Sequence, residues 1–570
     1  MAKIVRVNVT RGEVSIEAVP ESYMMLGGRG LTSRIVLDEV DPNCEPLGGL
    51  NKLVIAPGLL TGTNAPSSAR ISIGAKSPLT GGIKESNAGG TVARKLARLG
   101  IKAIIIEGKP LDKSSYILNI NNHEISLLPA QDLSGLGNYE TVARLQEKYG
   151  ANIGVISIGQ AGEAKMSNAS VAITDMEGLP TRHCGRGGMG AVMGSKGIKA
   201  IIVDDSGSSQ LLIEIEDKEG FNEICRSLAK TLIETKVGLK NFGTASLVDP
   251  TAAIGAFPTR NYSRGYFENK DKINGKALQD LIVERGGKYG HSCSPGCVIR
   301  CSNVVHDAEG KYLTSGLEYE TIGLCGSNLE IDSLDVISTI NYKCDDYGID
   351  TMETGVAIGV AMEAGIAKFG DAEAAIKLVD EIGNNTLTGR ILGQGATITG
   401  KVLGVTRVPA VKGQSFAAYD PRALKGNAYT YATTPMGADH TAGNCLPGRG
   451  AWRGQVDPNK KDYYLEVSRD LQIYATVLDV MGFCNFVGIS PAEMEIIAKL
   501  LSKATGKEVT VADVEEIGKD TIRTELEFNR RAGFTKADDR LPEFCKFEKL
   551  PPKDLYNDIE DEELDRVLDF

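Results

Sequence analysis

The sequence predicts an α+β protein in which a β-rich N-terminal domain precedes two mostly α-helical domains. Short apolar runs separated by Gly, Pro, Ser and Thr turns fill residues 1–206, whereas apolar residues recur at three- and four-residue steps beyond about residue 211. We expect the domains to span 1–206, 207–409 and 410–570. Glycine is abundant, at 66 of 570 residues, so the chain needs many tight turns and close backbone approaches.

The N-terminal segment begins with alternating apolar residues at 4–9 and 14–18 on either side of Arg11-Gly12, which is the pattern of a β-hairpin. Further β-type runs lie at 53–56, 69–74, 103–107, 153–158 and 200–203. Helical periodicity is limited here to 92–99 and 139–148. These short runs bounded by turns predict sheets with few helices.

Two amphipathic helices are predicted in the later part of the chain, and both end in the same motif. Apolar residues step along 334–344 and 465–478, and D-x-x-G motifs follow at 345–350 and 479–484. Gly348 and Gly482 suit the left-handed residue that ends a helix. The acids Asp345 and Asp479 lie at the negative end of a helix dipole, where a carboxylate is disfavoured. They therefore indicate a function, such as accepting paired N–H groups from a heterocycle held between the two helices.

Charge and hydropathy exclude several partners. The formal net charge is −11, which disfavours nucleic acid because duplex binding needs a basic face. The sequence contains no run of 18 apolar residues, so it predicts no membrane helix. The N-terminus also lacks the apolar core of a signal peptide. The sequence has no G-x-G-x-x-G motif that follows a strand and has an acidic residue about twenty positions later, so direct binding of NAD is not expected. We therefore expect a cytoplasmic protein without nucleic-acid or membrane partners.

The eleven cysteines are an odd number, which argues against a disulfide framework. Three isolated ones are expected to be buried apolar side chains: Cys44, Cys225 and Cys545. Cys293, Cys297 and Cys301 instead fall within nine residues. Three clustered thiolates with a distant fourth are a frequent ligand set for a [4Fe–4S] cluster. Zinc, which prefers paired C-x2-C units, and coincidence are the alternatives.

Four longer stretches are specific enough to indicate a family. They are APGLLTGTNAPSSARISIGAKSPLTGGIKESNAGG (56–90), RHCGRGGMGAVMGSKGIKAI (182–201), GLEYET (316–321) and YDPRALKGNAYTYATTPMGADH (419–440). With the two D-x-x-G motifs, they resemble the aldehyde ferredoxin oxidoreductase family over nearly the whole chain. The resemblance implies a tungsten bis-pyranopterin cofactor on the β-rich domain, with the two helical domains closing over it.

The resemblance also implies which residues contact the cofactor. One pterin would be held by Asp345, Ile349 and Asp350, and the other by Asp479 and Phe483. Arg70 would lie between a pterin and the cluster. The cofactor's phosphates would meet Asn87, Gly89, Arg182, His183, Gly185 and Arg186. The backbone carbonyls of Asn87 and His183 would bind the Mg²⁺ that bridges those phosphates.

For the cluster, the resemblance supplies Cys484 as the fourth ligand of the [4Fe–4S] centre, with Cys293, Cys297 and Cys301. The family spacing is C-x2-C-x3-C, whereas this chain has C-x3-C-x3-C, which widens one loop and removes no ligand. Electrons would then leave singly, to ferredoxin or to a small Fe–S subunit.

For the chemistry, Glu320 of GLEYET and His440 of GADH match the family's active-site glutamate and histidine. A buried glutamate can serve as general base, and a histidine can hold the substrate oxygen and pass a proton. The implied reaction is the oxidation of an aldehyde and water to a carboxylic acid, reversible with a strong reductant. The alternatives are reduction of an aromatic acyl-CoA or other carbonyl substrate within a larger electron-transfer complex, and an Fe–S carrier without pterin.

Several points stay open at the level of sequence. Cys325, five residues after Glu320, is either a buried packing residue or a tungsten ligand, as in the family branch that reduces aromatic acyl-CoA esters. Thr339 replaces the glutamate that holds an intersubunit iron in dimeric relatives, and Thr441 replaces a basic residue that follows the histidine in some of them. The oligomeric state and the substrate are therefore undetermined. Tungsten and molybdenum are not distinguished, because pterin sulfurs would bind either metal.

Overall fold

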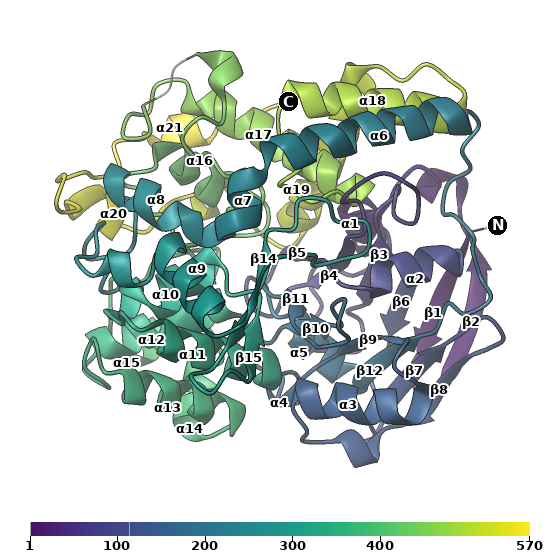
Figure 1. Cartoon of the computed structure of the whole chain (residues 1–570), viewed down its shortest axis with the longest axis horizontal. Coiled ribbons are helices and arrows are strands. Elements are labelled where there is room, and N and C mark those ends of the chain that lie inside the picture. Colours follow the sequence, from purple (N-terminus) through teal and green to yellow (C-terminus); the bar gives the residue numbers. More distant parts are fainter. Residues whose placement is uncertain (1, 113, 455–456) are drawn as a thin grey trace.

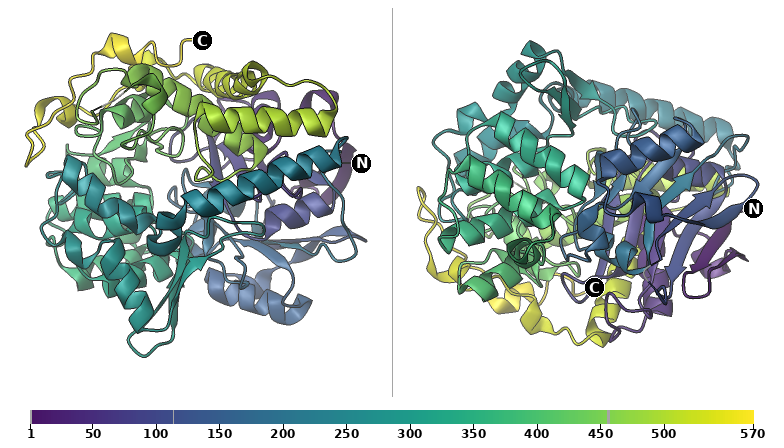
Figure 2. Two further views of the ribbon diagram at one scale, coloured as in Figure 1. Left: turned by 45° about the horizontal axis from the view of Figure 1, so that its top comes forward. Right: turned by 90° about the horizontal axis from the view of Figure 1, so that it is seen from below.

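The protein has two sheets in its N-terminal segment and is mostly helical thereafter, as a computed structural model that describes residues 2–112, 114–454 and 457–570 shows. The predicted α+β class is confirmed. The sheets lie on one side of the molecule, purple to blue in Figure 1, and most helices lie on the other. Helices α6 and α18 pack side by side along one edge, which the left view of Figure 2 also shows. The domain boundaries at residues 206 and 409 stay predictions.

Each of the two large sheets has six strands. The first has the order β2-β1-β6-β3-β4-β5, and the second β11-β10-β9-β12-β7-β8. Their bounds are β1 Lys3–Asn8, β2 Glu13–Ala18, β3 Leu53–Pro57, β4 Ile71–Lys76, β5 Ile83–Ala88, β6 Ile101–Glu107, β7 Tyr116–Ile120, β8 Ile125–Pro129, β9 Gly154–Ser157, β10 Val171–Ile173, β11 Arg182–Cys184 and β12 Ile198–Val203. The predicted hairpin is confirmed, with Val7 opposite Val14.

The N-terminal segment also carries more helix than its periodicity predicts. Its helices are α1 Gly28–Glu39, α2 Val92–Arg98, α3 Asn138–Tyr149, α4 Gln160–Glu163 and α5 Met189–Ser195. The predictions at 92–99 and 139–148 are confirmed, but α1 and α5 were not predicted. Helix α1 begins Gly-Arg-Gly and packs against β4, α17 and α19. Because α1 is buried on several sides, its sequence does not show a clear alternation of an apolar and a polar face. Glycine is also a poor helix former. Both features hide this helix from a prediction based on periodicity.

The remaining described chain is mostly helical and also contains one three-stranded antiparallel sheet and one two-stranded sheet. The helices are α6 Lys218–Thr235, α7 Val237–Phe242, α8 Val248–Ile254, α9 Gly275–Glu284, α10 Tyr319–Cys325, α11 Leu334–Tyr347, α12 Thr351–Glu363, α13 Ala372–Gly383, α14 Leu387–Leu392, α15 Ala396–Leu403, α16 Lys425–Thr433, α17 Tyr464–Met481, α18 Pro491–Thr505, α19 Val511–Arg531, α20 Phe544–Phe547 and α21 Asp561–Leu564. The strands are β13 Lys288–His291, β14 Ser302–His306, β15 Tyr312–Ser315, β16 Ala410–Val411 and β17 Gln414–Ser415. Among the described residues, no helix combines the length and apolar character that crossing a bilayer requires.

Helices α11 and α17 end as their motifs predict. Gly348 and Gly482 follow their last residues in the left-handed region, with φ of 69° and 88°. Gly482 is also closely packed, since a Cβ there would fall 2.8 Å from Cα of Gly58. Asp350 then caps the next helix, α12, by accepting a hydrogen bond from the backbone N–H of Met352. The motif residues Asp345 and Asp479 at these two helix ends therefore lie close to the sheets, on the wall of one cavity.

Candidate functional site

One cavity of about 430 Å³ lies between the sheets and the helices. Its wall is made by Arg70 just before β4, strands β5 and β11, the loop 293–301, the ends of α11 and α17 and the loop 439–449. All the predicted site residues line it except Cys297, Phe483 and Cys325. Residues far apart in the sequence therefore meet at one place.

The loop that carries three clustered cysteines is joined to Cys484 by Ser67. The backbone N–H of Ser67 donates to the carbonyl of Gly296 at 2.9 Å, and its Oγ accepts from the N–H of Val298 at 3.3 Å. The carbonyl of Ser67 accepts from the N–H of Cys484 at 3.0 Å. Ser67 has a left-handed φ of 57°, a conformation unusual for serine. This residue thus holds both cysteine-bearing loops in place.

The four predicted cluster ligands differ from the other cysteines in exposure. All eleven cysteines are free thiols; seven are buried, as predicted for the three isolated ones. The four that are only partly buried are Cys293, Cys297, Cys301 and Cys484. Burial raises the pKa of the Cys484 thiol, and the charge of Arg70 partly offsets this shift. A bound metal would deprotonate such a thiol outright.

The spacing of these thiols bears on the kind of metal. Among the described residues, only Asp175, Glu177 and His291 form a set of three metal-ligating groups whose ligand atoms all lie within 4.8 Å of one another. No three of the four cysteines do. A tetrahedral zinc site needs sulfurs about 3.8 Å apart, given Zn–S bonds of about 2.3 Å. As these four side chains stand, their sulfurs do not form the compact set that one zinc ion needs.

Three arginines line the cavity without a carboxylate within 4 Å, among the residues that the structure describes: Arg70, Arg182 and Arg449. Nε and one terminal nitrogen of Arg182 are buried and have no hydrogen-bond partner. Arg70 donates to the side chain of Asn87 and, at 3.2 Å, to its backbone carbonyl. Buried donors without acceptors are costly, so this wall is suited to an anion.

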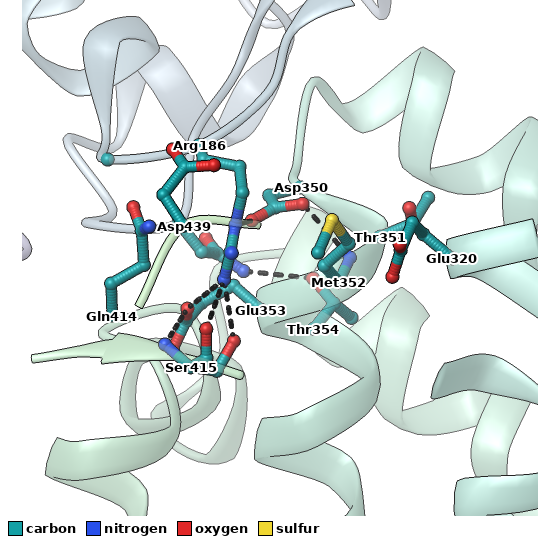
Figure 3. A network of polar contacts seen from close by, with 12 residues as sticks. Arg186, Glu320, Asp350, Thr351, Met352, Glu353, Thr354, Gln414, Ser415 and Asp439 are labelled. Atoms are coloured by element: carbon teal, nitrogen blue, oxygen red, sulfur yellow. Dashed lines mark hydrogen bonds and ion pairs between the residues drawn. The ribbon is translucent and has the colours of Figure 1, made fainter. Parts of the chain in front are cut away.

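Arg186, four residues after Arg182, is in a different situation. Its Nε donates to Asp350 at 3.3 Å, and its terminal nitrogens donate to the carbonyls of Ala438 and Ser415 at 2.9 and 2.7 Å (Figure 3). A second carboxylate, fully buried Glu353, lies 3.5 Å away. The guanidinium is satisfied by protein atoms and ties the second sheet to α12 and to the chain leading to His440.

The two motif acids are buried at the cavity wall. Oδ1 of Asp345 lies 3.2 Å from Nε2 of His183, and burial raises the pKa of Asp345. Burial, followed by the charge of Glu85, raises the pKa of Asp479. Arg29 offsets part of this second shift from 3.5 Å. Both acids therefore bind protons more tightly than usual in the absence of a ligand.

Glu320 and His440, the two residues that the resemblance assigns to the active site, lie next to each other; their catalytic roles stay predictions. Nε2 of His440 lies 3.1 Å from Oε1 of Glu320, although no hydrogen bond is aligned between them. Oε2 of Glu320 accepts from the N–H of Ala418 at 2.7 Å, which orients the carboxylate. The ring centroid of Tyr419 lies 5.8 Å from that of His440. One carboxylate oxygen and Nδ1 of His440 are left without partners.

Several cavity residues were missed from the sequence. Lys84 and Asp439 form a buried ion pair with Nζ and Oδ2 2.5 Å apart, although both lie in stretches that carry the family resemblance. Glu85 follows Lys84 and has an unpartnered, buried Oε1. The Cys325 thiol, in contrast, donates to the carbonyl of Thr351 at 3.4 Å and lies behind the wall. Its ligation of tungsten stays a prediction.

The fold and the cavity define a class of protein, an α+β fold with a cavity between sheets and helices that unpaired arginines and cysteines line. Sequence models described as "Aldehyde ferredoxin oxidoreductase, N-terminal domain" and "Aldehyde ferredoxin oxidoreductase, domains 2 & 3" match residues 4–205 and 222–569. The chain belongs to the aldehyde ferredoxin oxidoreductase family, a family of tungsten-containing oxidoreductases. The resemblance seen in the sequence is confirmed, and the family implies a tungsten–pterin cofactor and an iron–sulfur cluster.

Individual relatives differ in what they act on. The tungsten-containing aldehyde ferredoxin oxidoreductases of Thermococcus kodakarensis and Pyrococcus furiosus are each 32% identical over 575 residues, covering 96% of this chain and 92% of the relative. The aliphatic sulfonate oxidoreductase, WOR-like subunit, of Pyrococcus furiosus is 29% identical over 497 residues, covering 79% and 76%. The solved active-site complex of benzoyl coenzyme A reductase with 1,5-dienoyl-CoA has a TM-score of 0.82 at 21% identity, covering 100% and 93%. This last likeness shows the fold.

Proposed function

We propose that the protein oxidises an aldehyde to a carboxylic acid and passes the electrons one at a time through a [4Fe–4S] cluster to ferredoxin or a small Fe–S subunit. The observation that carries the proposal is the meeting of Glu320 and His440 in a cavity that three of the four partly buried cysteines also line: Cys293, Cys301 and Cys484. When bound, the tungsten (or molybdenum) bis-pyranopterin would accept two electrons from the substrate, and the cluster would release them singly.

The cysteines Cys293, Cys297, Cys301 and Cys484 would hold the cluster. No three of these four sulfurs lie within 4.8 Å of one another, whereas one zinc ion needs its sulfurs about 3.8 Å apart. Ser67 fixes the two loops that carry them. A Cβ at Gly89 would fall 3.2 Å from the Cys293 sulfur, a tight contact, so glycine lets the backbone pass close to this cysteine. These contacts support a preformed site for a group larger than a single ion.

The same wall supports the binding of an anionic cofactor. The unpartnered nitrogens of Arg182 would donate to phosphate oxygens, and Arg70, near Cys484 and Cys293, would lie between pterin and cluster. Asp345 and Asp479 would accept N–H groups of the two pterins, with Ile349, Asp350, Phe483, Gly89, Gly185 and Arg186 adjoining. The carbonyls of Asn87 and His183 would bind Mg²⁺.

Glu320 and His440 would divide the proton chemistry. The Ala418 N–H engages one carboxylate oxygen of Glu320 and leaves the other free to take a proton from water or a hydrated aldehyde. The adjacent His440 would hold the substrate oxygen through a ring N–H and pass a proton onward. Tyr319, Tyr419 and the buried helix α10 restrict water access to this end of the cavity.

A second candidate function is reduction of an aromatic acyl-CoA or another carbonyl substrate within a larger electron-transfer complex. The fold of this chain resembles the benzoyl coenzyme A reductase structure over its whole length, and this likeness is the reason to retain this second function as a candidate. Cys325 would then ligate the metal, which requires the thiol to leave the Thr351 carbonyl.

The test is metal analysis and turnover of anaerobically purified protein. We expect about one tungsten or molybdenum and four irons per chain, with aldehyde-dependent reduction of a viologen dye. Glu320→Gln should lower kcat by about 100-fold or more at unchanged metal content. Iron without tungsten or molybdenum, or a loaded protein that reduces no dye with any aldehyde, would contradict the proposal.

A further inference from the structure

A compact group of metal-ligating side chains lies outside the cavity that the proposed function uses. It consists of Asp175, Glu177 and His291, whose ligand atoms all lie within 4.8 Å of one another and none of which lines the cavity. Asp175 and Glu177 belong to the turn between β10 and β11, and His291 is the last residue of β13. Two segments far apart in the sequence therefore bring one imidazole and two carboxylates together.

The buried imidazole of His291 is the feature that indicates a bound ion. Its side chain is 7% exposed, and its Nε2 lies 2.8 Å from Oε2 of Glu177. Nevertheless this nitrogen is buried and has no aligned hydrogen bond to the part of the chain that the structure describes. A buried polar atom without a partner is costly. A metal ion held between the two side chains would satisfy it, because a ring nitrogen of neutral imidazole is a metal ligand.

The carboxylate of Asp175 is buried and fixed in direction by its own turn. Oδ1 accepts from the N–H groups of Glu177 and Leu179, both at 2.9 Å, and Oδ2 accepts from the Thr181 hydroxyl at 2.6 Å. Because a carboxylate offers about four acceptor positions, one is left for a metal. Such supporting bonds orient a ligating carboxylate.

These two acids also lack a cationic partner. Asp175 is 1% exposed. Among the described lysines and arginines, none lies within 4 Å of the carboxylate of Asp175 or Glu177, and His291 is the one basic side chain there. Buried charges are usually paired or coordinate a metal, so a cation at this place would supply the missing counter-charge.

The donor set selects the class of metal. Imidazole suits zinc and other divalent transition ions, whereas Mg²⁺ and Ca²⁺ prefer oxygen ligands alone. Three protein ligands leave one position of a tetrahedral zinc for water. The side chain of Glu177 is 41% exposed, so an ion can reach the site from solvent.

We propose that Asp175, Glu177 and His291 form a binding site for a divalent transition-metal ion of the zinc type. This site is distinct from the tungsten and iron–sulfur centres that the family implies, and it does not depend on the proposed aldehyde oxidation.

An ion at this site would tie the turn after β10 to the strand that leads into the cysteine loop. His291 lies two positions before Cys293. The N–H of Gly90 donates to the carbonyl of Cys293, and the N–H of Thr91 donates to the carbonyl of Thr174, both at 2.9 Å. Residues 90–91 thus already bridge the two segments, and the ion would add a second bridge. We therefore expect it to stabilise the folded state by mass action.

The test is calorimetric titration of zinc chloride into anaerobically purified holoenzyme that has been treated with EDTA. We expect one zinc ion to bind per chain with a Kd of about 1 μM or lower. His291→Ala removes the imidazole, and Glu177→Gln changes an exposed side chain without changing its size. Each variant should weaken zinc binding at least about tenfold. Absence of such a zinc ion, or unchanged affinity in Glu177→Gln, would overturn the inference.

X-ray absorption at the zinc edge distinguishes this site from the cysteines. Zinc at the proposed site should have nitrogen and oxygen ligands alone, at about 2.0–2.2 Å. A sulfur shell at about 2.3 Å would place the ion on cysteines and refute the proposal. Because neither measurement uses turnover, the outcome is independent of whether an aldehyde is oxidised.

The matched control is His123→Ala, which removes an exposed histidine that precedes a glutamate in the turn between β7 and β8. Among the described residues, His123 belongs to no compact set of three metal-ligating groups. This variant should bind zinc as the wild type does. Zinc should also raise the Tm of the wild type and of His123→Ala but not that of Glu177→Gln; an equal rise in all three would contradict the assignment.

Discussion

The buried ion pair between Lys84 and Asp439 gives a prediction whose size follows from its burial. The Lys84 side chain is 1% exposed and that of Asp439 10%. Burial alone would raise the pKa of Asp439, but the charges of Lys84 and Arg186 outweigh it and hold this pKa well below its usual range. Lys84→Met removes the closest counter-charge and leaves the carboxylate with its hydrogen bonds from Thr441. We expect a loss of about 3–5 kcal/mol in the free energy of unfolding.

The sign of the pH dependence follows from the lowered pKa. A carboxyl group whose pKa is lowered by folding stabilises the folded state at any pH above its unfolded-state pKa, which is about 3.9. This stabilisation is lost as the pH falls from that value through the folded-state pKa. The difference between wild type and Lys84→Met should therefore be constant from about pH 5 to 8 and shrink below about pH 4. Guanidinium unfolding followed by circular dichroism measures it.

The control is Lys276→Met, which breaks the exposed pair of Lys276 with Asp280, whose side chains are 66% and 62% exposed. It should cost less than about 1 kcal/mol. A Lys84→Met loss no larger than this, or a loss fully additive with that of Asp439→Asn, would refute the reasoning, because partners in one buried pair must show coupling.

Three further predictions concern single residues. Gly482→Ala should cost at least about 1–2 kcal/mol more than Gly12→Ala in the same unfolding assay, because both glycines have positive φ but only Gly482 has atoms within 3 Å of an added Cβ. Asp479→Asn should reduce the loss of stability that the wild-type apoprotein shows as pH rises from about 4 through the raised pKa of Asp479, and buried acids such as Asp345 should keep the rest of it; unchanged pH-dependent unfolding would contradict this. Cys325→Ala should leave the sulfur shell of tungsten unaltered in X-ray absorption, since the thiol binds the Thr351 carbonyl; a lost sulfur would establish ligation.

The parts of the site that could be predicted from the sequence are those that local spacing specifies. Helices α11 and α17 each end at a glycine that follows an apolar stripe. This end is predictable because it depends only on the left-handed backbone conformation that glycine adopts at that position. Cysteines within nine residues indicate a metal centre for the same reason. The fourth cysteine, and the pair Glu320 and His440, came from the family resemblance, since no local pattern links residues so far apart.

What could not be predicted depends on contacts across the fold. Ser67 resembles any serine of a turn, and only its bonds to the loops of Gly296 and Cys484 show its importance. Arg182 and Arg186 are indistinguishable in sequence, four residues apart in a Gly-rich stretch. Nevertheless Arg186 is satisfied by Asp350 and backbone carbonyls, whereas Arg182 keeps unpartnered nitrogens. Pairing is decided by neighbours that the tertiary fold supplies.

That difference in pairing separates two kinds of charge in one cavity. Lys84 and Arg186 are neutralised by protein carboxylates, and each joins a strand of the N-terminal sheets to the helical part of the chain. Arg70, Arg182 and Arg449 face the cavity without such partners. An unpaired buried cation opposes folding. This applies most to Arg182, which is 8% exposed, because Arg70 and Arg449 are only half-buried. An anion bound here would stabilise the folded state by mass action. The paired cations thus join the wall together, while the unpaired ones leave it positively charged and would attract the phosphates of an anionic cofactor.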